Sequence, residues 1–285
     1  EYCAPCLFGV EGILGDELRR MGAENVRPET GRVLFAGGPD ILARANIGSR
    51  YAERIQILAG SFPARSFVEL FQGVKAIPWE RWIGKHNAFP VKGWSLDSTL
   101  HSVPDCQAIV KKAAAERLGR VYGQSWLEET GPVCQIQFTI RKDMATLLLD
   151  TSGPGLHKRG YRANAGGAPI KETLAAAIVD VTRARRASLV CDPCCGSGTL
   201  LIEAALAARG IAPGIRRRFA AMEWDSVPRE IWTQERRRAR EREHPGSPFR
   251  GQGGDIDEDC LRLTCENAEK AGVAACITAR RADLR

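Results

Sequence analysis

The residues best suited to chemistry lie at positions 189–203, which read LVCDPCCGSGTLLIE. A short apolar strand is expected to end at Asp192, a turn with Gly196 and Gly198 follows, and a helix is expected to begin near Thr199. This order places a helix N-terminus and glycine backbone beside any ligand beyond the carboxyl end of the strand. The segment therefore predicts a nucleotide-type binding site.

Three ligand classes use this geometry, and the residue types distinguish between them. A P-loop needs Gly-Lys-Ser/Thr, which the turn lacks, and a dinucleotide fingerprint needs a third glycine where Leu201 stands. The carboxylate of Asp192 would repel a pyrophosphate, but it suits a cationic ammonium or sulfonium group. S-adenosylmethionine carries both groups, so it is the expected cofactor.

Acidic residues at the ends of the following strands could hold the rest of this cofactor. Two ribose hydroxyls need a carboxylate at the end of the second strand, and Asp255 in the segment GGDID has that place. Glu223 is a rival at the usual spacing of about 20 residues, but the strand before it would be poor and a charge-rich helix follows. Asp283, near the end of the third strand, could accept a hydrogen bond from the adenine amino group.

The elements that position these acids follow a turn cluster, SGPG, at residues 152–155. A parallel α/β arrangement is expected there, because strands and helices alternate. The expected strands are 188–191, 249–254 and 276–279, and the expected helices are 169–183, 199–209, 228–243 and 258–271. We expect the helix with the arginine run 236–240 to be solvated and held by internal ion pairs; an RNA clamp is the alternative.

The first half of the chain lacks this regularity and predicts an α+β unit with antiparallel pairing. Helices are expected at 12–21, 39–47, 66–77 with Ser66 as N-cap, and from an N-cap at Asp105 to Leu118; strands are expected at 32–36, 54–59, 90–98, 134–141 and 145–150. The last two strands should form a hairpin across Lys142 and Asp143.

Composition limits the class of protein. The 285 residues carry a net charge of +7, of which residues 1–157 contribute +1 (18 basic, 17 acidic) and residues 158–285 contribute +6 (23 basic, 17 acidic). The sequence has neither an apolar run of about 20 residues nor a signal peptide, so a cytoplasmic protein without membrane contact is expected. Ten cysteines without a regular framework predict reduced thiols, and the Cys3 and Cys6 pair predicts two strand thiols and no metal site.

Three segments resemble a known family. Residues 192–205 (DPCCGSGTLLIEAA), 156–162 (LHKRGYR) and 168–177 (APIKETLAAA) are similar to the THUMP-domain guanine-N2 RNA methyltransferases of bacteria, of which the closest members modify large-subunit ribosomal RNA. The resemblance implies a ferredoxin-like lobe at 1–50 and a THUMP RNA-binding domain at 51–157. It also implies the N-terminal half of a doubly wound, Rossmann-like class I methyltransferase domain at 158–285, incomplete at its C-terminus.

The resemblance also implies functional residues. The cofactor-binding residues would be Asp192, Cys194, Gly196, Ser197, Gly198, Thr199, Asp255, Ile256, Asp283 and, at the methionine carboxylate, Thr173. The RNA-binding residues would be Lys111, Lys112, Arg141, Lys142, Lys158, Arg159 and Arg162. A solvated helix face is the alternative for Thr173, and a solvated linker is the alternative for residues 157–162.

One departure concerns catalysis. The family's Asn/Asp-Pro-Pro-Tyr motif is absent, so no catalytic residue is assigned and the 285-residue chain alone is expected to be inactive. We expect an S-adenosylmethionine-dependent enzyme that forms N2-methylguanosine in 23S ribosomal RNA or a pre-ribosomal particle. The alternatives are a tRNA guanine-N2 methyltransferase, a DNA or protein methyltransferase on the same scaffold, and a non-catalytic RNA-binding protein with a vestigial methyltransferase domain.

Overall fold

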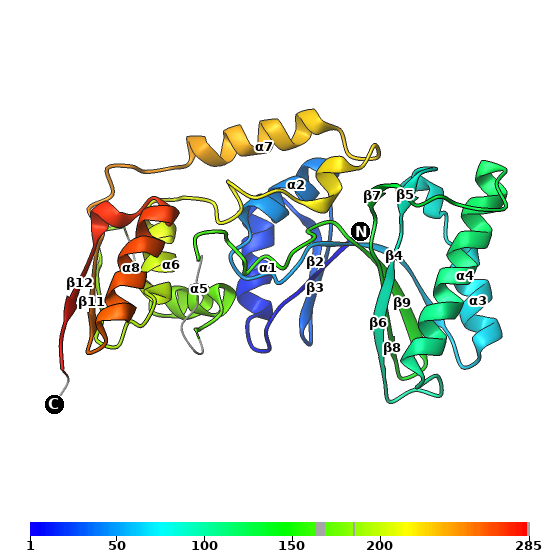
Figure 1. The fold of residues 1–285 in the computed structure, drawn as a ribbon, viewed down its shortest axis with the longest axis horizontal. Helices are drawn as coiled ribbons and strands as arrows, with labels where there is room; N and C mark the ends of the chain where they lie inside the picture. The colour runs from blue at the N-terminus through cyan, green and yellow to red at the C-terminus, as the bar shows by residue number, and fades with distance from the viewer. Residues whose placement is uncertain (163–168, 185, 284–285) are drawn as a thin grey trace.

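Seven strands of the N-terminal part form one continuous sheet in the computed structural model, which describes residues 1–162, 169–184 and 186–283. The strand order is β2-β3-β1-β4-β9-β8-β6 (Figure 1). The strands are β1 (Tyr2–Pro5), β2 (Glu24–Glu29), β3 (Arg32–Ala36), β4 (Gln56–Pro63), β6 (Val91–Leu96), β8 (Ile136–Arg141) and β9 (Met144–Asp150). Since β4 pairs with β1 on one side and with β9 on the other, it joins what would otherwise be two separate sheets.

Helices cover one face of this sheet. They are α1 (Glu11–Arg20), α2 (Pro39–Gly48), α3 (Phe67–Ala76) and α4 (Val103–Tyr122). In β8, Ile136, Phe138 and Ile140 are fully buried toward the helices, whereas Gln137 and Thr139 lie on the other face. That other face forms the floor of a hollow of about 660 Å³. The predicted period-two pattern of this strand is confirmed.

Local details of the N-terminal part differ in places from the expectations. The Ser66 hydroxyl accepts a hydrogen bond from the Glu69 amide, as predicted. The prediction of Asp105 as an N-cap is wrong: α4 begins after Ser102, and Asp105 lies in the first turn, where its carboxylate favours the positive end of the helix dipole. The exposed strand β2 was not predicted, because it lacks an apolar face.

Short elements complete this part of the molecule. Strands β5 (Asn87–Ala88) and β7 (Gly131–Val133) pair in parallel. The 3-10 helices in the described part of the chain are η1 (Trp79–Arg81), η2 (Ala220–Glu223) and η3 (Ala274–Cys276).

The C-terminal part contains a parallel sheet in the order β10-β11-β12. Its strands are β10 (Leu189–Asp192), β11 (Arg250–Asp255) and β12 (Ile277–Arg281), and its helices are α5 (Glu172–Val181), α6 (Thr199–Ala208) and α8 (Glu258–Ala271). The βαβαβ order is confirmed. The expected fold class, α+β followed by a Rossmann-like α/β unit, is therefore correct.

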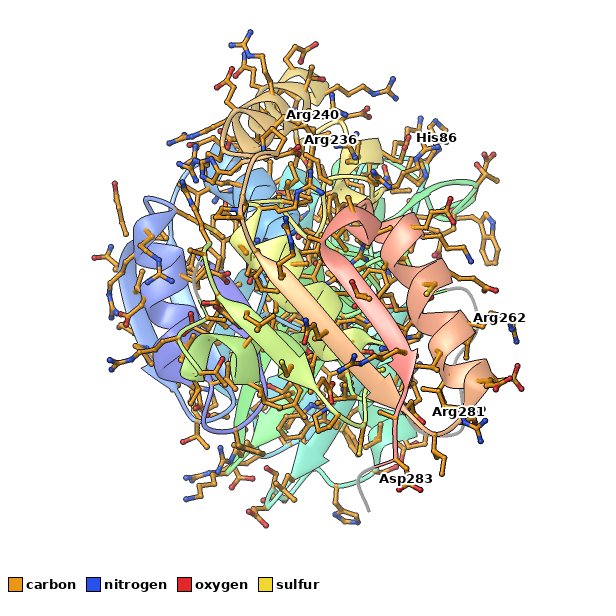
Figure 2. All side chains as sticks on the ribbon, turned by 90° about the vertical axis from the view of Figure 1, so that its left-hand side faces the viewer. His86, Arg236, Arg240, Arg262, Arg281 and Asp283 are labelled. Atoms are coloured by element: carbon orange, nitrogen blue, oxygen red, sulfur yellow. The ribbon has the colours of Figure 1, made fainter. Side chains whose placement is uncertain are left out.

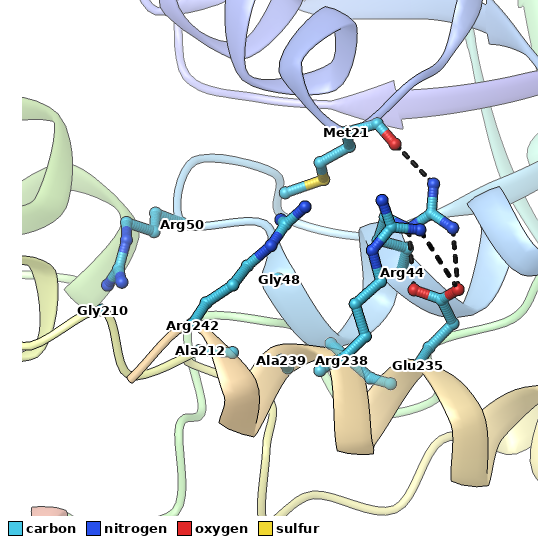
Figure 3. Close-up of a pocket in the computed structure, with 11 residues that line it drawn as sticks. Met21, Arg44, Gly48, Arg50, Gly210, Ala212, Glu235, Arg238, Ala239 and Arg242 are labelled. Atoms are coloured by element: carbon cyan, nitrogen blue, oxygen red, sulfur yellow. Dashed lines mark hydrogen bonds and ion pairs between the residues drawn. The ribbon is translucent and has the colours of Figure 1, made fainter. Parts of the chain in front are cut away.

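Helix α7 (Arg229–Glu241) does not join this parallel sheet but lies along α2 of the N-terminal part (Figure 1). Both carboxylate oxygens of Glu235 accept hydrogen bonds from Arg44 on α2, each at 2.7 Å (Figure 3). Trp232 is buried and stacks on Phe219, with ring centroids 5.4 Å apart. The prediction of a solvated helix is therefore wrong for this face of α7. On the exposed face, Arg237 and Glu241 form an ion pair within the helix, as expected.

Among the described residues, none of the helices has the length and apolar character needed to span a bilayer.

Candidate functional site

The segment from Asp192 to Thr199, here called the cofactor turn, leaves the carboxyl end of β10 and enters α6. Gly196 and Gly198 both have left-handed backbone, with φ of +53° and +77°. A Cβ at position 198 would lie 2.7 Å from the side chain of Thr264. Position 198 therefore requires glycine for both its conformation and its close approach to α8.

Two buried side chains of α8 fix the cofactor turn. The Thr264 hydroxyl donates to the Gly196 carbonyl at 2.8 Å, and the Asn267 amide donates to the Ser197 carbonyl at 3.1 Å. Because a trans peptide is planar, the N–H of Ser197 points away from α8, opposite to the Gly196 carbonyl. The turn is thus held with a backbone donor turned outward before any ligand binds.

Asp255 links the second strand to the same turn. One carboxylate oxygen accepts a hydrogen bond from the Gly196 amide at 2.9 Å, and the other accepts from the Asp257 amide at 3.0 Å. A carboxylate has about four acceptor positions, so each oxygen retains room for a further donor. The strand end and the turn therefore form one unit.

Asp192 is half-buried, and its carboxylate accepts a hydrogen bond from the Cys194 amide at 3.3 Å. Burial raises the pKa of Asp192, and the negative charge of Asp255 acts in the same direction. A cation placed beside the two carboxylates would relieve this repulsion. The electrostatics of the site therefore favour a positively charged ligand group.

The remaining predicted cofactor residues differ in exposure and in their hydrogen bonds. Cys194 and Ile256 are exposed, and Asp283 is exposed two residues beyond β12, at the same edge of the sheet (Figure 2). The hydroxyls of Ser197 and Thr199 are 3.4 Å apart at the start of α6. Thr173 is fully buried, and its hydroxyl donates to Glu53 of the N-terminal part at 2.6 Å, so its donor is already used.

Glu223, the rival for the ribose, is not at a strand end. It lies in η2 and pairs with Arg218 at 2.7 Å, close to the N-terminal part. The structure therefore leaves Asp255 as the acid at the end of the second strand.

Sequence reasoning missed Thr264 and Asn267. They are three residues apart on the helix that follows the second strand, and both are buried polar residues. A polar pair at this spacing on the inner face of a helix was the available signal.

Two expected RNA-binding residues are structural. The Arg159 side chain is only 2% exposed, donates to the carbonyls of Ser49, Arg50 and Leu156, and lies 3.5 Å from Glu203. The donors of Arg159 therefore join the two parts of the molecule, and its expected contact with RNA stays a prediction.

Arg162 is engaged in the same way. One of its guanidinium nitrogens donates to the Ile170 carbonyl and to the Thr199 hydroxyl, at 3.0 and 2.7 Å, and lies 3.5 Å from Glu172. These contacts do not test the predicted RNA contact of Arg162, which stays a prediction. Arg162 instead connects the segment after residue 156 to the first residue of α6.

The other expected RNA-binding residues differ in availability. Lys111 is paired with Glu129 and lies 3.4 Å from the centre of the Phe89 ring, so internal contacts occupy it. Lys112, Arg141, Lys142 and Lys158 are exposed. The ten cysteines are free thiols, and no group of three or more metal-ligating side chains occurs within the described part of the chain.

Comparison with protein families places three matches along the chain. Residues 1–56 match the RlmL ferredoxin-like domain, residues 64–150 match the THUMP domain, and residues 159–285 match the RMKL-like methyltransferase domain. Together with the cofactor turn, these matches define a methyltransferase that carries a THUMP domain.

Two relatives have substantial sequence identity. YpsC of Bacillus subtilis, whose name describes an RNA methyltransferase, is 44% identical over 268 residues, which cover 93% of this chain and 69% of YpsC. The ribosomal RNA large subunit methyltransferase K/L of Aeromonas salmonicida is 34% identical over 289 residues, which cover 100% of this chain and 40% of that enzyme. The chain belongs to this family of THUMP-domain RNA methyltransferases.

Solved structures agree in fold. A predicted N6-adenine-specific DNA methylase from Listeria monocytogenes has a TM-score of 0.95 at 45% identity, over 99% of this chain and 74% of that one. SMU.472, which was solved in complex with SAH, has a TM-score of 0.94 at 38% identity, over the same shares of the two chains. The name of the Listeria structure gives DNA as the substrate, whereas the names of the two relatives in sequence give RNA.

Proposed function

We propose that this chain binds S-adenosylmethionine at the cofactor turn and that the enzyme methylates the N2 amine of a guanine in 23S ribosomal RNA. The observation that carries the proposal is the pair of carboxylates, Asp192 and Asp255, beside a turn whose backbone is fixed in advance.

The cofactor assignment rests on charge and on hydrogen bonds. When bound, S-adenosylmethionine supplies a methyl group activated by a sulfonium. Asp192 would lie near the cationic end, and Asp255 would accept from the ribose hydroxyls through its remaining acceptor positions. The SAH complex of SMU.472 supports this choice, because SAH is the product left after methyl transfer.

The RNA assignment rests on the THUMP match and on the names of the two relatives in sequence. The net charge of +6 in residues 158–285 agrees with a polyanionic partner (23 basic minus 17 acidic residues). Guanine N2 follows from the resemblance of the motifs, and ribosomal RNA follows from the name of the Aeromonas enzyme. We also propose a cytoplasmic location, because the proposed substrate is ribosomal RNA.

Calorimetry with S-adenosylmethionine tests the cofactor site. Asp255→Ala removes the ribose acceptor and the anchor of the Gly196 amide, so we expect affinity to fall about tenfold or more. Glu223→Ala removes an acid of equal charge outside the cofactor turn and should leave the affinity unchanged. Equal affinity of wild type and Asp255→Ala would contradict the assignment.

Nucleoside analysis after deletion of the gene tests the substrate. Ribosomal RNA from the deletion strain should lack N2-methylguanosine at one position of 23S RNA, and restoring the gene should restore it. Loss from tRNA would favour the tRNA enzyme, and loss of N6-methyladenine from DNA would favour the activity in the name of the Listeria relative.

A further inference from the structure

A cavity of about 240 Å³ lies between the segment 159–161 and the loop 211–217 that follows α6. We call it the Arg217 cavity. It also contacts the C-terminal end of α8 at Lys270 and Ala271. The cofactor turn is at the opposite end of α6, a helix of ten residues and therefore about 15 Å long. The cavity is thus a site separate from the cofactor turn.

The lining of the Arg217 cavity is cationic. Arg159, Arg216, Arg217 and Lys270 contribute to it, and none of the residues that line it is acidic. Glu203 lies 3.5 Å from Arg159 and offsets its charge. Within residues 1–162, 169–184 and 186–283, the other three cations have no carboxylate partner in an ion pair. An excess of about three positive charges therefore surrounds the cavity.

Arg217 is the least satisfied of these cations. It is only 8% exposed, and one nitrogen donates to the Pro154 carbonyl at 2.6 Å. Its other terminal nitrogen is buried without an acceptor among the described residues. Burial lowers the pKa of Arg217 to about 10, and the positive charges of Arg159 and Arg54 add to this effect, whereas the negative charge of Asp150, the ion-pair partner of Arg54, acts in the opposite direction. A buried charged donor without an acceptor costs free energy. A ligand that supplies an acceptor would therefore be favoured at this site.

A neighbouring cavity of about 150 Å³ provides a comparison (Figure 3). Arginines line it as well, but Glu235 lies among them and accepts two hydrogen bonds from Arg44. Arg44 also donates to the Met21 carbonyl at 2.6 Å. That cavity therefore contains its own anion, whereas the Arg217 cavity does not.

We propose that the Arg217 cavity binds a phosphoryl group. Guanidinium groups bind phosphate oxygens through several charge-assisted hydrogen bonds, and a phosphoryl group has enough oxygens for more than one cation. The cavity volume of about 240 Å³ is several times the roughly 30 Å³ that one water occupies. A phosphoryl group therefore fits, together with part of the molecule that carries it. The group could come from the RNA backbone or from free phosphate.

Inorganic phosphate is the probe for the test, with binding followed by calorimetry at constant ionic strength and without S-adenosylmethionine. We expect saturable binding to the wild-type chain, about tenfold weaker in Arg217→Gln and several-fold weaker in Lys270→Gln. Lys270 is exposed, so its replacement tests the site even if Arg217→Gln does not fold. Lys85→Gln changes the same charge at an exposed position between η1 and β5 and should bind as the wild type does.

Two results would overturn the proposal: no saturable phosphate binding by the wild-type chain, or equal affinity in the wild type and in both cavity variants. A 23S RNA fragment added in a second titration identifies the source. Displacement of phosphate by RNA supports a backbone phosphate, and binding that RNA does not disturb supports a free phosphate. Neither titration depends on methyl transfer, so failure of the proposed function would leave this result unaffected.

Discussion

At the scale of single residues, the candidate site depends on strand-end acids and on polar contacts from distant positions. The sequence was sufficient to predict that Asp192 and Asp255 lie close together, because the carboxyl ends of parallel strands meet at one edge of a sheet. It was not sufficient for Arg159, since the carbonyl of Ser49 that it contacts is 110 residues away. When only the neighbouring residues in the sequence are considered, a basic residue such as Arg159 is expected to be exposed to solvent.

Gly198→Ala should damage the cofactor turn. The left-handed backbone and the 2.7 Å approach to Thr264 both oppose a Cβ, so we expect a loss of about 1–3 kcal/mol in the free energy of unfolding and weaker cofactor binding. Urea unfolding and calorimetry measure the two effects. Gly246→Ala is the control, because a Cβ there meets nothing within 4 Å. Similar losses for both variants would argue against a special role for position 198.

At the scale of elements, α7 shows how composition can mislead. The helix carries many arginines and glutamates, which is typical of a solvated helix, yet it packs on α2 through Trp232 and Glu235. Arg44, the partner of Glu235, is 191 residues away. The boundaries of α7 could be predicted from its sequence, but its packing partner could not.

The ion pair between α2 and α7 should contribute to stability. Glu235 is 9% exposed, so Glu235→Gln weakens two charge-assisted hydrogen bonds in a shielded place and should cost about 2–3 kcal/mol of unfolding free energy. Glu241→Gln makes the same chemical change in an exposed pair with Arg237 and should cost less than about 0.5 kcal/mol. Chemical denaturation of the two variants gives the comparison, and equal losses would show that α7 is not held by Glu235.

At the scale of the whole molecule, the order and type of most helices and strands could be predicted, because hydrophobic periodicity and capping are local properties. The continuity of the N-terminal sheet could not. It depends on β4, which pairs with β1 at one end and with β9 along its length, and pairing between distant strands has no local signal. The polar contacts between the two parts, such as that of Thr173 with Glu53, were missed for the same reason.

The surroundings of His157 should make stability depend on pH. Burial lowers the pKa of His157 below its ordinary value of 6.5; Glu53, 3.3 Å away, acts in the opposite direction, and Lys171 and Lys158 act with burial. The unfolded chain therefore binds the proton more readily, so stability is lost as pH falls from about 6.5 toward the lowered pKa. His157→Gln should flatten this part of the pH profile in thermal unfolding. The exposed His101→Gln is the control, and an unchanged slope in His157→Gln would contradict the prediction.

The path of the chain between α6 and β11 has a consequence for recombination between genes. This segment returns to the N-terminal part, where Trp224 donates to the Val133 carbonyl and Ala221 donates to the Thr151 carbonyl. A chimera with one crossover near residue 157 would lose these contacts and uncover the apolar surface beneath them. The part of the gene that encodes the complete N-terminal core is therefore discontinuous. To exchange this core between genes, recombination needs crossovers on both sides of α7 in addition to the one near residue 157.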